Sequence, residues 1–173
     1  MTRQNKYLIS PNINDDTLTQ RIKGSDQENN SIETKVIKEK SLTIFLNNQE
    51  IVTLMTIGDH AKYLAIGYLL NQNMINLKDT IKAIEYDDSI DTIVVRTNKK
   101  TNYEKILRKK ITTSGCAQGT IFGDIYDEIQ KIKINSRAVI KHKWIYEISK
   151  KINLTPSLYL EAGAIHGCVI VKS

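Results

Sequence analysis

The sequence predicts a mixed α/β or α+β domain, because strand-like and helix-like segments alternate along the chain. The strand-like runs are short, rich in β-branched residues and separated by polar turns. The helix-like segments carry apolar residues three or four positions apart, which places those residues on one helix face. The chain has 173 residues, of which 40% are hydrophobic, so its length predicts one domain and its composition a buried core.

Residues 1–34 are predicted to form a flexible segment ahead of the domain. The stretch 24–31 is polar and charged, and it cannot bury enough apolar surface to become ordered. The first 31 residues also lack the apolar core of a secretion signal. We therefore expect order to begin near Val36 and the domain to occupy residues 35–173.

The first element of the domain is predicted to be a β-hairpin. Leu42, Ile44 and Leu46 recur at every second position, which is the period of a strand with one buried face. After an Asn-rich turn at 47–49, a second strand-like run covers 50–55. Two such runs around a short polar turn are typical of a hairpin.

A helix is predicted directly after this hairpin. Asp59 is a suitable N-cap, because its carboxylate can accept hydrogen bonds from the first free backbone N–H groups. The apolar stripe of the helix is expected to consist of Ala61, Leu64, Ala65 and Tyr68. The helix is expected to end near Asn71 or Asn73.

Further strands and helices follow along the chain. Residues 81–86 and 92–96 are predicted strands, joined by the polar turn 87–89. The last residues, 168–173, begin like a buried strand and stop there. Helices are predicted at three places: 102–110, from about Phe122, and from Ser136 to the stop at Pro156.

The segment 112–120 is the strongest candidate for a functional site. It places Cys116 in a loop of small residues, where Gly115 and Gly119 allow a tight turn and a close approach by a partner. Cations before the loop and a predicted helix after it both stabilise a thiolate, the form that attacks sulfur or binds metal. A buried, inert cysteine in a turn is the alternative interpretation. The cations are Lys105, Arg108, Lys109 and Lys110, and the helix carries Phe122, Ile125, Ile129 and Ile132 on one face.

Charge and composition limit the class of partner. The net charge of +6 favours an anionic partner, such as a phosphate-bearing cofactor, an acidic protein or nucleic acid. Nucleic acid is the weakest of these, because aromatic residues make up only 6% of the chain and no stacking motif is visible. No run approaches the roughly 18 apolar residues of a membrane helix. We therefore expect no membrane partner. Cys116 and Cys168 are too few for a disulfide framework, so we expect a cytoplasmic protein.

No metal site is predicted. The sequence has no His-x-Glu and no Cys-x-x-Cys, so zinc-deaminase chemistry is not expected. Walker and Gly-x-Gly-x-x-Gly motifs are also absent from it. His60 and His142 have no supporting context and are expected on the surface. Cys168 follows Gly167 and precedes an apolar run, so it is expected to be a core cysteine.

Four segments of the chain together resemble the formate dehydrogenase accessory sulfurtransferase family, FdhD. Residues 42–55 are similar to the family's Pro-Leu-x-Ile-x-x-Asn-Gly hairpin and the strand after it. Residues 59–70 resemble its Asp-x-x-x-Leu-Ala-x-Gly-Phe-Leu helix. Thr113-Ser114-Gly115-Cys116 resembles its reactive loop, commonly Ser-x-Gly-Cys-Gly-x-Cys-Gly. Ala162-Gly163-Ala164-Ile165-His166 resembles its Thr-Gly-Gly-x-His segment, and the four follow the family's order over about residues 39–171.

The resemblance implies a cytidine-deaminase-like fold and a sulfur-carrier function. Members of the family take persulfide sulfur from a cysteine desulfurase. They deliver it to the molybdenum bis(pyranopterin guanine dinucleotide) cofactor of formate dehydrogenase, which is bound as a client. By this resemblance Cys116 is the catalytic residue that carries the persulfide, and Gly115, Gly163 and His166 bind the cofactor. A structural role fits His166 equally well, and a homodimer is left open.

Three departures from the family pattern change these expectations. The loop's second cysteine aligns with Gly119, which excludes an internal Cys–Cys mechanism and leaves a single persulfide carrier. Ala162 stands where the family has Thr. The family also continues beyond the end of this chain, so we expect its C-terminal part to be missing here. A non-catalytic fragment that binds cofactor or partner is therefore the alternative function.

Overall fold

The computed structural model describes residues 13, 15–98, 110–112, 120–122, 139–167, 169 and 171. The chain divides into two compact units, one made of residues 1–38 and 137–173 and the other of residues 39–136. The sequence predicted a single domain from residue 35 onward. Each unit is described below by itself.

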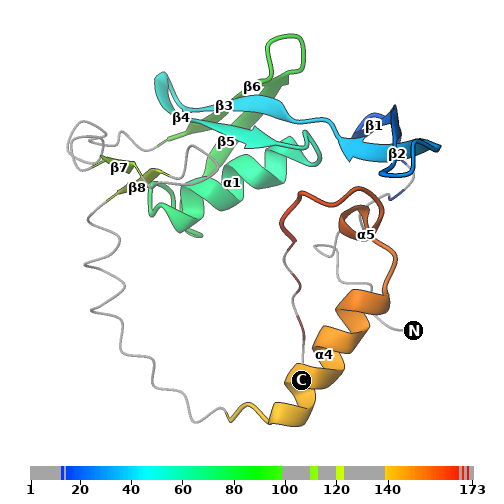
Figure 1. The fold of residues 1–173 in the computed structure, drawn as a ribbon. Helices are drawn as coiled ribbons and strands as arrows, with labels where there is room; N and C mark the ends of the chain where they lie inside the picture. Colours follow the sequence, from blue (N-terminus) through cyan, green and yellow to red (C-terminus); the bar gives the residue numbers. More distant parts are fainter. Residues whose placement is uncertain are drawn as a thin grey trace, which may run out of the picture. The chain divides into compact units, whose positions relative to one another are not determined.

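The second unit is built on a four-stranded mixed sheet with the strand order β4-β3-β6-β5. The strands are β3 (Lys40–Leu46), β4 (Gln49–Thr56), β5 (Ile81–Asp87) and β6 (Thr92–Thr97). Neighbours β3–β4 and β5–β6 are antiparallel hairpins, whereas the central pair β3–β6 is parallel. The helix α1 (Ala61–Asn71) packs against the sheet (Figure 1). This arrangement confirms both predicted hairpins and the mixed α+β class.

The core lies between this sheet and α1. The parallel register pairs Ile44 with Ile93 and Leu46 with Val95, and all four side chains are fully buried. The every-second-residue pattern of the sequence therefore marks the buried face correctly. The remaining buried apolar residues of this cluster are Leu42, Ile51, Val52, Ala61, Ala65, Leu69, Met74 and Ile75.

Helix α1 differs from its prediction in two respects. Its buried residues are Ala61, Ala65 and Leu69, spaced by four, whereas the predicted stripe member Leu64 is 37% exposed. Ile66, Leu70 and the predicted stripe member Tyr68 are partly buried and also pack against the core. The predicted N-cap is also wrong: His60 holds the N-cap position with a left-handed φ of 50°, and no side chain caps the helix.

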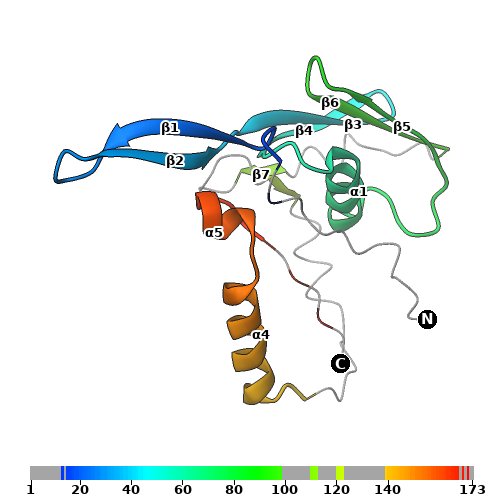
Figure 2. The ribbon, with the colours of Figure 1, turned by 90° about the vertical axis from the view of Figure 1, so that its right-hand side faces the viewer.

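The first unit contains a hairpin that the sequence did not predict. Strands β1 (Thr19–Ser25) and β2 (Ser31–Ile37) pair antiparallel over their whole length, and Figure 2 shows them as two long adjacent strands joined by one turn. Residues 19–25 and 31–34, expected to be part of a flexible segment, thus belong to paired strands here. The Asp26 carboxylate holds the turn, because it accepts hydrogen bonds from the backbone N–H groups of Glu28 and Asn30 at 2.8 and 2.9 Å.

Two helices complete the described part of this unit. Helix α4 (His142–Leu154) begins six residues after the predicted start at Ser136 and ends before Pro156, as predicted. The short helix α5 (Leu158–Ala162) was not predicted. Beyond it, Val169 is 60% exposed and lies in no strand, so the predicted buried strand is wrong there, as it is for Val171.

Two other predicted helices fall largely outside the described residues. These are the helices at 102–110 and from Phe122. Of the first, the structure describes only the last residue, Lys110, which begins strand β7 (Lys110–Thr112). Of the second, it describes only the first residue, Phe122, which ends strand β8 (Thr120–Phe122).

Candidate functional site

The predicted catalytic residue belongs to a segment whose two ends are held together. Strands β7 and β8 pair antiparallel, and their register places Thr112 opposite Thr120. Residues 113–119 connect this pair, and Cys116 is the middle residue of that connection. Cys116 and its neighbour Gly115 lie outside the described residues. The pairing nevertheless shows that Thr112 and Thr120, four residues before and after Cys116, lie opposite each other on neighbouring strands.

The predicted cofactor-binding segment follows helix α5. Ser157 precedes the helix, and its hydroxyl accepts a hydrogen bond from the Leu160 N–H at 3.3 Å. The helix ends at Gly163, whose N–H donates to the carbonyl of Tyr159 at 2.9 Å. Gly163 has a φ of 64°, a left-handed value that glycine adopts without strain. Capping at both ends therefore gives this five-residue helix a defined start and stop.

The residue after Gly163 continues the unusual backbone. Ala164 has a φ of 55°, which costs energy for a residue with a Cβ atom. His166 follows two residues later with an exposed side chain. A Cβ atom built at Gly163 would meet nothing within 4 Å, so the space beside this glycine is open.

An ion pair fixes the helix that carries this segment. The Lys35 ammonium of β2 lies 2.7 Å from the Glu161 carboxylate of α5, and both side chains are partly buried. The two residues are 126 positions apart in the sequence, and they join the hairpin to the helix within the first unit. Glu161 immediately precedes the segment that ends at His166. The ion pair therefore connects the helix just before Gly163 to the β1–β2 hairpin.

The predicted site residues fall into the two units of the chain. Gly163 and His166 belong to the first unit and lie in the segment after α5, whereas Gly115 and Cys116 belong to the second. The other two histidines, His60 and His142, are exposed, as predicted. Cys168, predicted as a core cysteine, lies outside the described residues.

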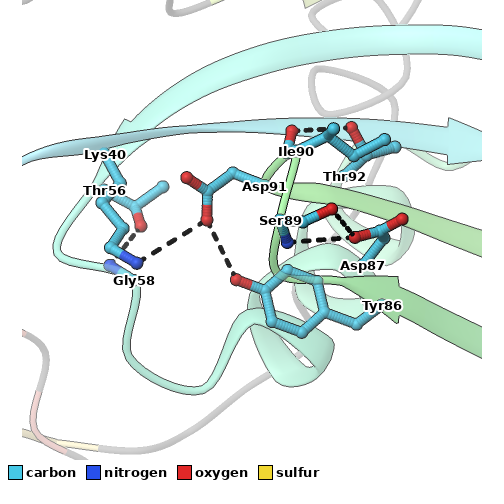
Figure 3. A network of polar contacts seen from close by, with 9 residues as sticks. All are labelled: Lys40, Thr56, Gly58, Tyr86, Asp87, Ser89, Ile90, Asp91 and Thr92. Atoms are coloured by element: carbon cyan, nitrogen blue, oxygen red, sulfur yellow. Dashed lines mark hydrogen bonds and ion pairs between the residues drawn. The ribbon is translucent and has the colours of Figure 1, made fainter.

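A polar network at one end of the four-stranded sheet was not predicted (Figure 3). Its centre is Asp91, in the turn between β5 and β6. The Tyr86 hydroxyl donates to Asp91 Oδ1 at 3.2 Å, and the Lys40 Nζ lies 3.8 Å from the same oxygen. Burial raises the pKa of the Tyr86 phenol, and the hydrogen bond and charge of Asp91 raise it further. Tyr86 therefore remains a neutral hydrogen-bond donor at physiological pH.

The same network includes the loop before α1. The Thr56 hydroxyl accepts a hydrogen bond from the Gly58 N–H at 2.6 Å, and Gly58 has a φ of 77°. A Cβ atom at Gly58 would lie 3.1 Å from Cδ of Lys40. The Lys40 side chain thus covers the glycine on its way to Asp91. These contacts fasten the start of β3, the end of β4 and the β5–β6 turn to one another, which is a structural role.

An open hollow of about 730 Å³ lies beside the C-terminal end of α1. Its lining combines apolar and amide side chains and contains none of the predicted site residues. The lining residues are Leu70, Asn71, Asn73, Ile75, Asn76, Leu77 and Lys78.

In the part of the chain that the structure describes, no three His, Cys, Asp or Glu side chains gather closely enough to hold a metal ion. None of the helices there is long and apolar enough to cross a membrane.

Comparison with known proteins assigns the family. The model of the FdhD/NarQ family matches residues 37–173, which is most of the chain. The chain belongs to the FdhD/NarQ family. The match includes the Cys116 loop and the Gly163–His166 segment, so both candidate regions lie inside the family's sequence.

Two curated relatives support the assignment. The chain is 22% identical over 135 residues to the sulfur carrier protein FdhD of Wolinella succinogenes, covering 78% of this chain and 47% of that protein. It is 25% identical over 150 residues to the sulfur carrier protein FdhD of Bacillus subtilis, covering 83% of this chain and 55% of that protein. The chain therefore spans about half the length of the curated relatives that it matches.

A solved structure is also similar. It is that of a protein from Desulfotalea psychrophila described as a formate dehydrogenase accessory protein, with 15% identity and a TM-score of 0.38. The similarity covers 56% of this chain and 43% of that one, which is too distant to add to the family assignment.

The backbone after α5 has positive φ values at two successive residues. Gly163 and Ala164 are the residues at which the sequence resembles the two glycines of Thr-Gly-Gly-x-His, and both lie in the region where glycine is favoured.

Proposed function

We propose that this chain is a sulfur carrier that uses Cys116 to take persulfide sulfur from a cysteine desulfurase. The observation that carries the proposal is the family match over residues 37–173, which contains a single cysteine in the reactive-loop position. The pairing of Thr112 with Thr120 supports it, because Cys116 is the middle residue, in sequence, of the segment that joins these two strands. Loops supported by a regular scaffold are common locations for reactive residues.

The first chemical step is an exchange between two sulfur compounds. The Cys116 thiolate attacks the outer sulfur of the desulfurase persulfide, a new S–S bond forms, and the donor cysteine leaves as a thiolate. Cys116 then carries the extra sulfur as a persulfide, and no net oxidation occurs. The step needs an accessible thiolate, and the sequence places Lys105, Arg108, Lys109 and Lys110 shortly before Cys116, the kind of neighbours that favour the thiolate form.

The second half of the proposal is delivery. The acceptor is the molybdenum bis(pyranopterin guanine dinucleotide) cofactor of a formate dehydrogenase, held as a client substrate. Gly163 would let the phosphate-bearing cofactor approach the backbone closely, and the exposed His166 would donate a hydrogen bond to it. The net charge of +6 suits such an anionic client. The reaction belongs in a reducing compartment, which for this protein is the cytoplasm.

The alternative function is a non-catalytic fragment that binds cofactor or partner without moving sulfur. The two functions differ in one observable, which is whether a cysteine of this chain acquires sulfur.

The test uses intact-mass measurement on three forms of the chain. The wild type, Cys116→Ser and Cys168→Ser are each incubated with a cysteine desulfurase and cysteine. The proposal expects one added sulfur on the wild type and on Cys168→Ser, removable by dithiothreitol, and none on Cys116→Ser. Labelling that follows Cys168 would overturn the assignment of Cys116. Cofactor binding without any sulfur on either cysteine would establish the binding-fragment alternative.

A further inference from the structure

We draw no further inference here: the strongest candidate, the apolar stripe of helix α4 on which Trp144 and Ile152 are exposed and Ile148 is half-buried, carries no proposal because nothing in the structure shows what covers it.

Discussion

Replacing Gly58 by alanine should destabilise the second unit through the backbone rather than through a clash. Gly58 has a φ of 77°, a region that side chains with a Cβ atom rarely adopt. The added Cβ would lie 3.1 Å from Cδ of Lys40. Because the Lys40 side chain is 46% exposed and flexible, it can move away at little cost.

The magnitude follows from three contributions to the free energy of unfolding. The left-handed conformation costs alanine roughly 1–2 kcal/mol. Alanine regains about 0.4–1 kcal/mol, because it restricts the unfolded chain more than glycine does. Displacing the Lys40 side chain adds a few tenths of a kcal/mol, the order of a few lost van der Waals contacts. The net expectation for Gly58→Ala is a loss of about 1 kcal/mol.

A matched control is available in the first unit. Gly24 has no left-handed φ, and a Cβ atom there would meet nothing within 4 Å. Gly24→Ala should therefore leave stability unchanged or raise it by up to about 1 kcal/mol. Urea unfolding followed by circular dichroism compares both variants with the wild type. Equal stability of the Gly58 and Gly24 variants would refute the backbone argument.

A double-mutant cycle separates the two causes. Gly58→Ala should cost nearly as much in a Lys40→Ala background as in the wild type, since the contact contributes only a few tenths of a kcal/mol. A coupling free energy above about 1 kcal/mol would show that the Lys40 contact dominates instead.

Three further predictions concern stability. Ala164→Gly should stabilise the chain by about 0.5–1 kcal/mol, because it relieves a positive φ of 55°, and an unchanged thermal midpoint would contradict this. Leu69→Ala removes a fully buried side chain and should lower the free energy of unfolding in urea by about 2–5 kcal/mol. Leu64→Ala, on the exposed side of the helix, should lower it by well under half of that. Similar losses for the two variants would contradict the assignment of Leu69 to the core. The hydrogen bond from Arg96 holds the pKa of Glu85 below its ordinary value of 4.5. The pair therefore stabilises the fold at pH values above 4.5, and this contribution is lost as the pH falls through the lowered pKa of Glu85. Glu85→Gln should therefore flatten the fall in stability at acid pH, and an unchanged slope would mean that the pair does not contribute.

Local sequence patterns predicted the elements whose stability comes from one buried face. The alternation at Leu42, Ile44 and Leu46 identified β3, because the sheet buries every second residue. The β1–β2 hairpin has no such pattern: most of its side chains are exposed, and backbone hydrogen bonds and the Asp26 turn hold it together. Polar composition predicted flexibility there because composition says nothing about backbone pairing.

Candidate site residues could be proposed from the sequence where neighbouring residues in the chain suggest the chemistry. Contacts that depend on how distant segments pair could not be predicted. The sequence proposes Cys116 from its small-residue loop and neighbouring cations, and Gly163 from its motif; both roles stay predictions. The contact between Lys35 and Glu161 was not predictable, because 126 positions separate two residues that look like ordinary surface charges. The grouping of Tyr86 and Asp91 with Lys40 likewise depends on how three strands align.

The central claim is that Cys116 of this FdhD/NarQ family chain accepts sulfur, and locating that sulfur on the unmutated protein tests it most directly. The chain is incubated with cysteine desulfurase and cysteine, alkylated to protect persulfides, digested, and analysed by peptide mass spectrometry. A chain treated with desulfurase but without cysteine serves as the control. We predict one additional sulfur on the peptide that contains Cys116 and none on the peptide that contains Cys168. Sulfur on Cys168, or on neither peptide while the desulfurase turns over, would contradict the account.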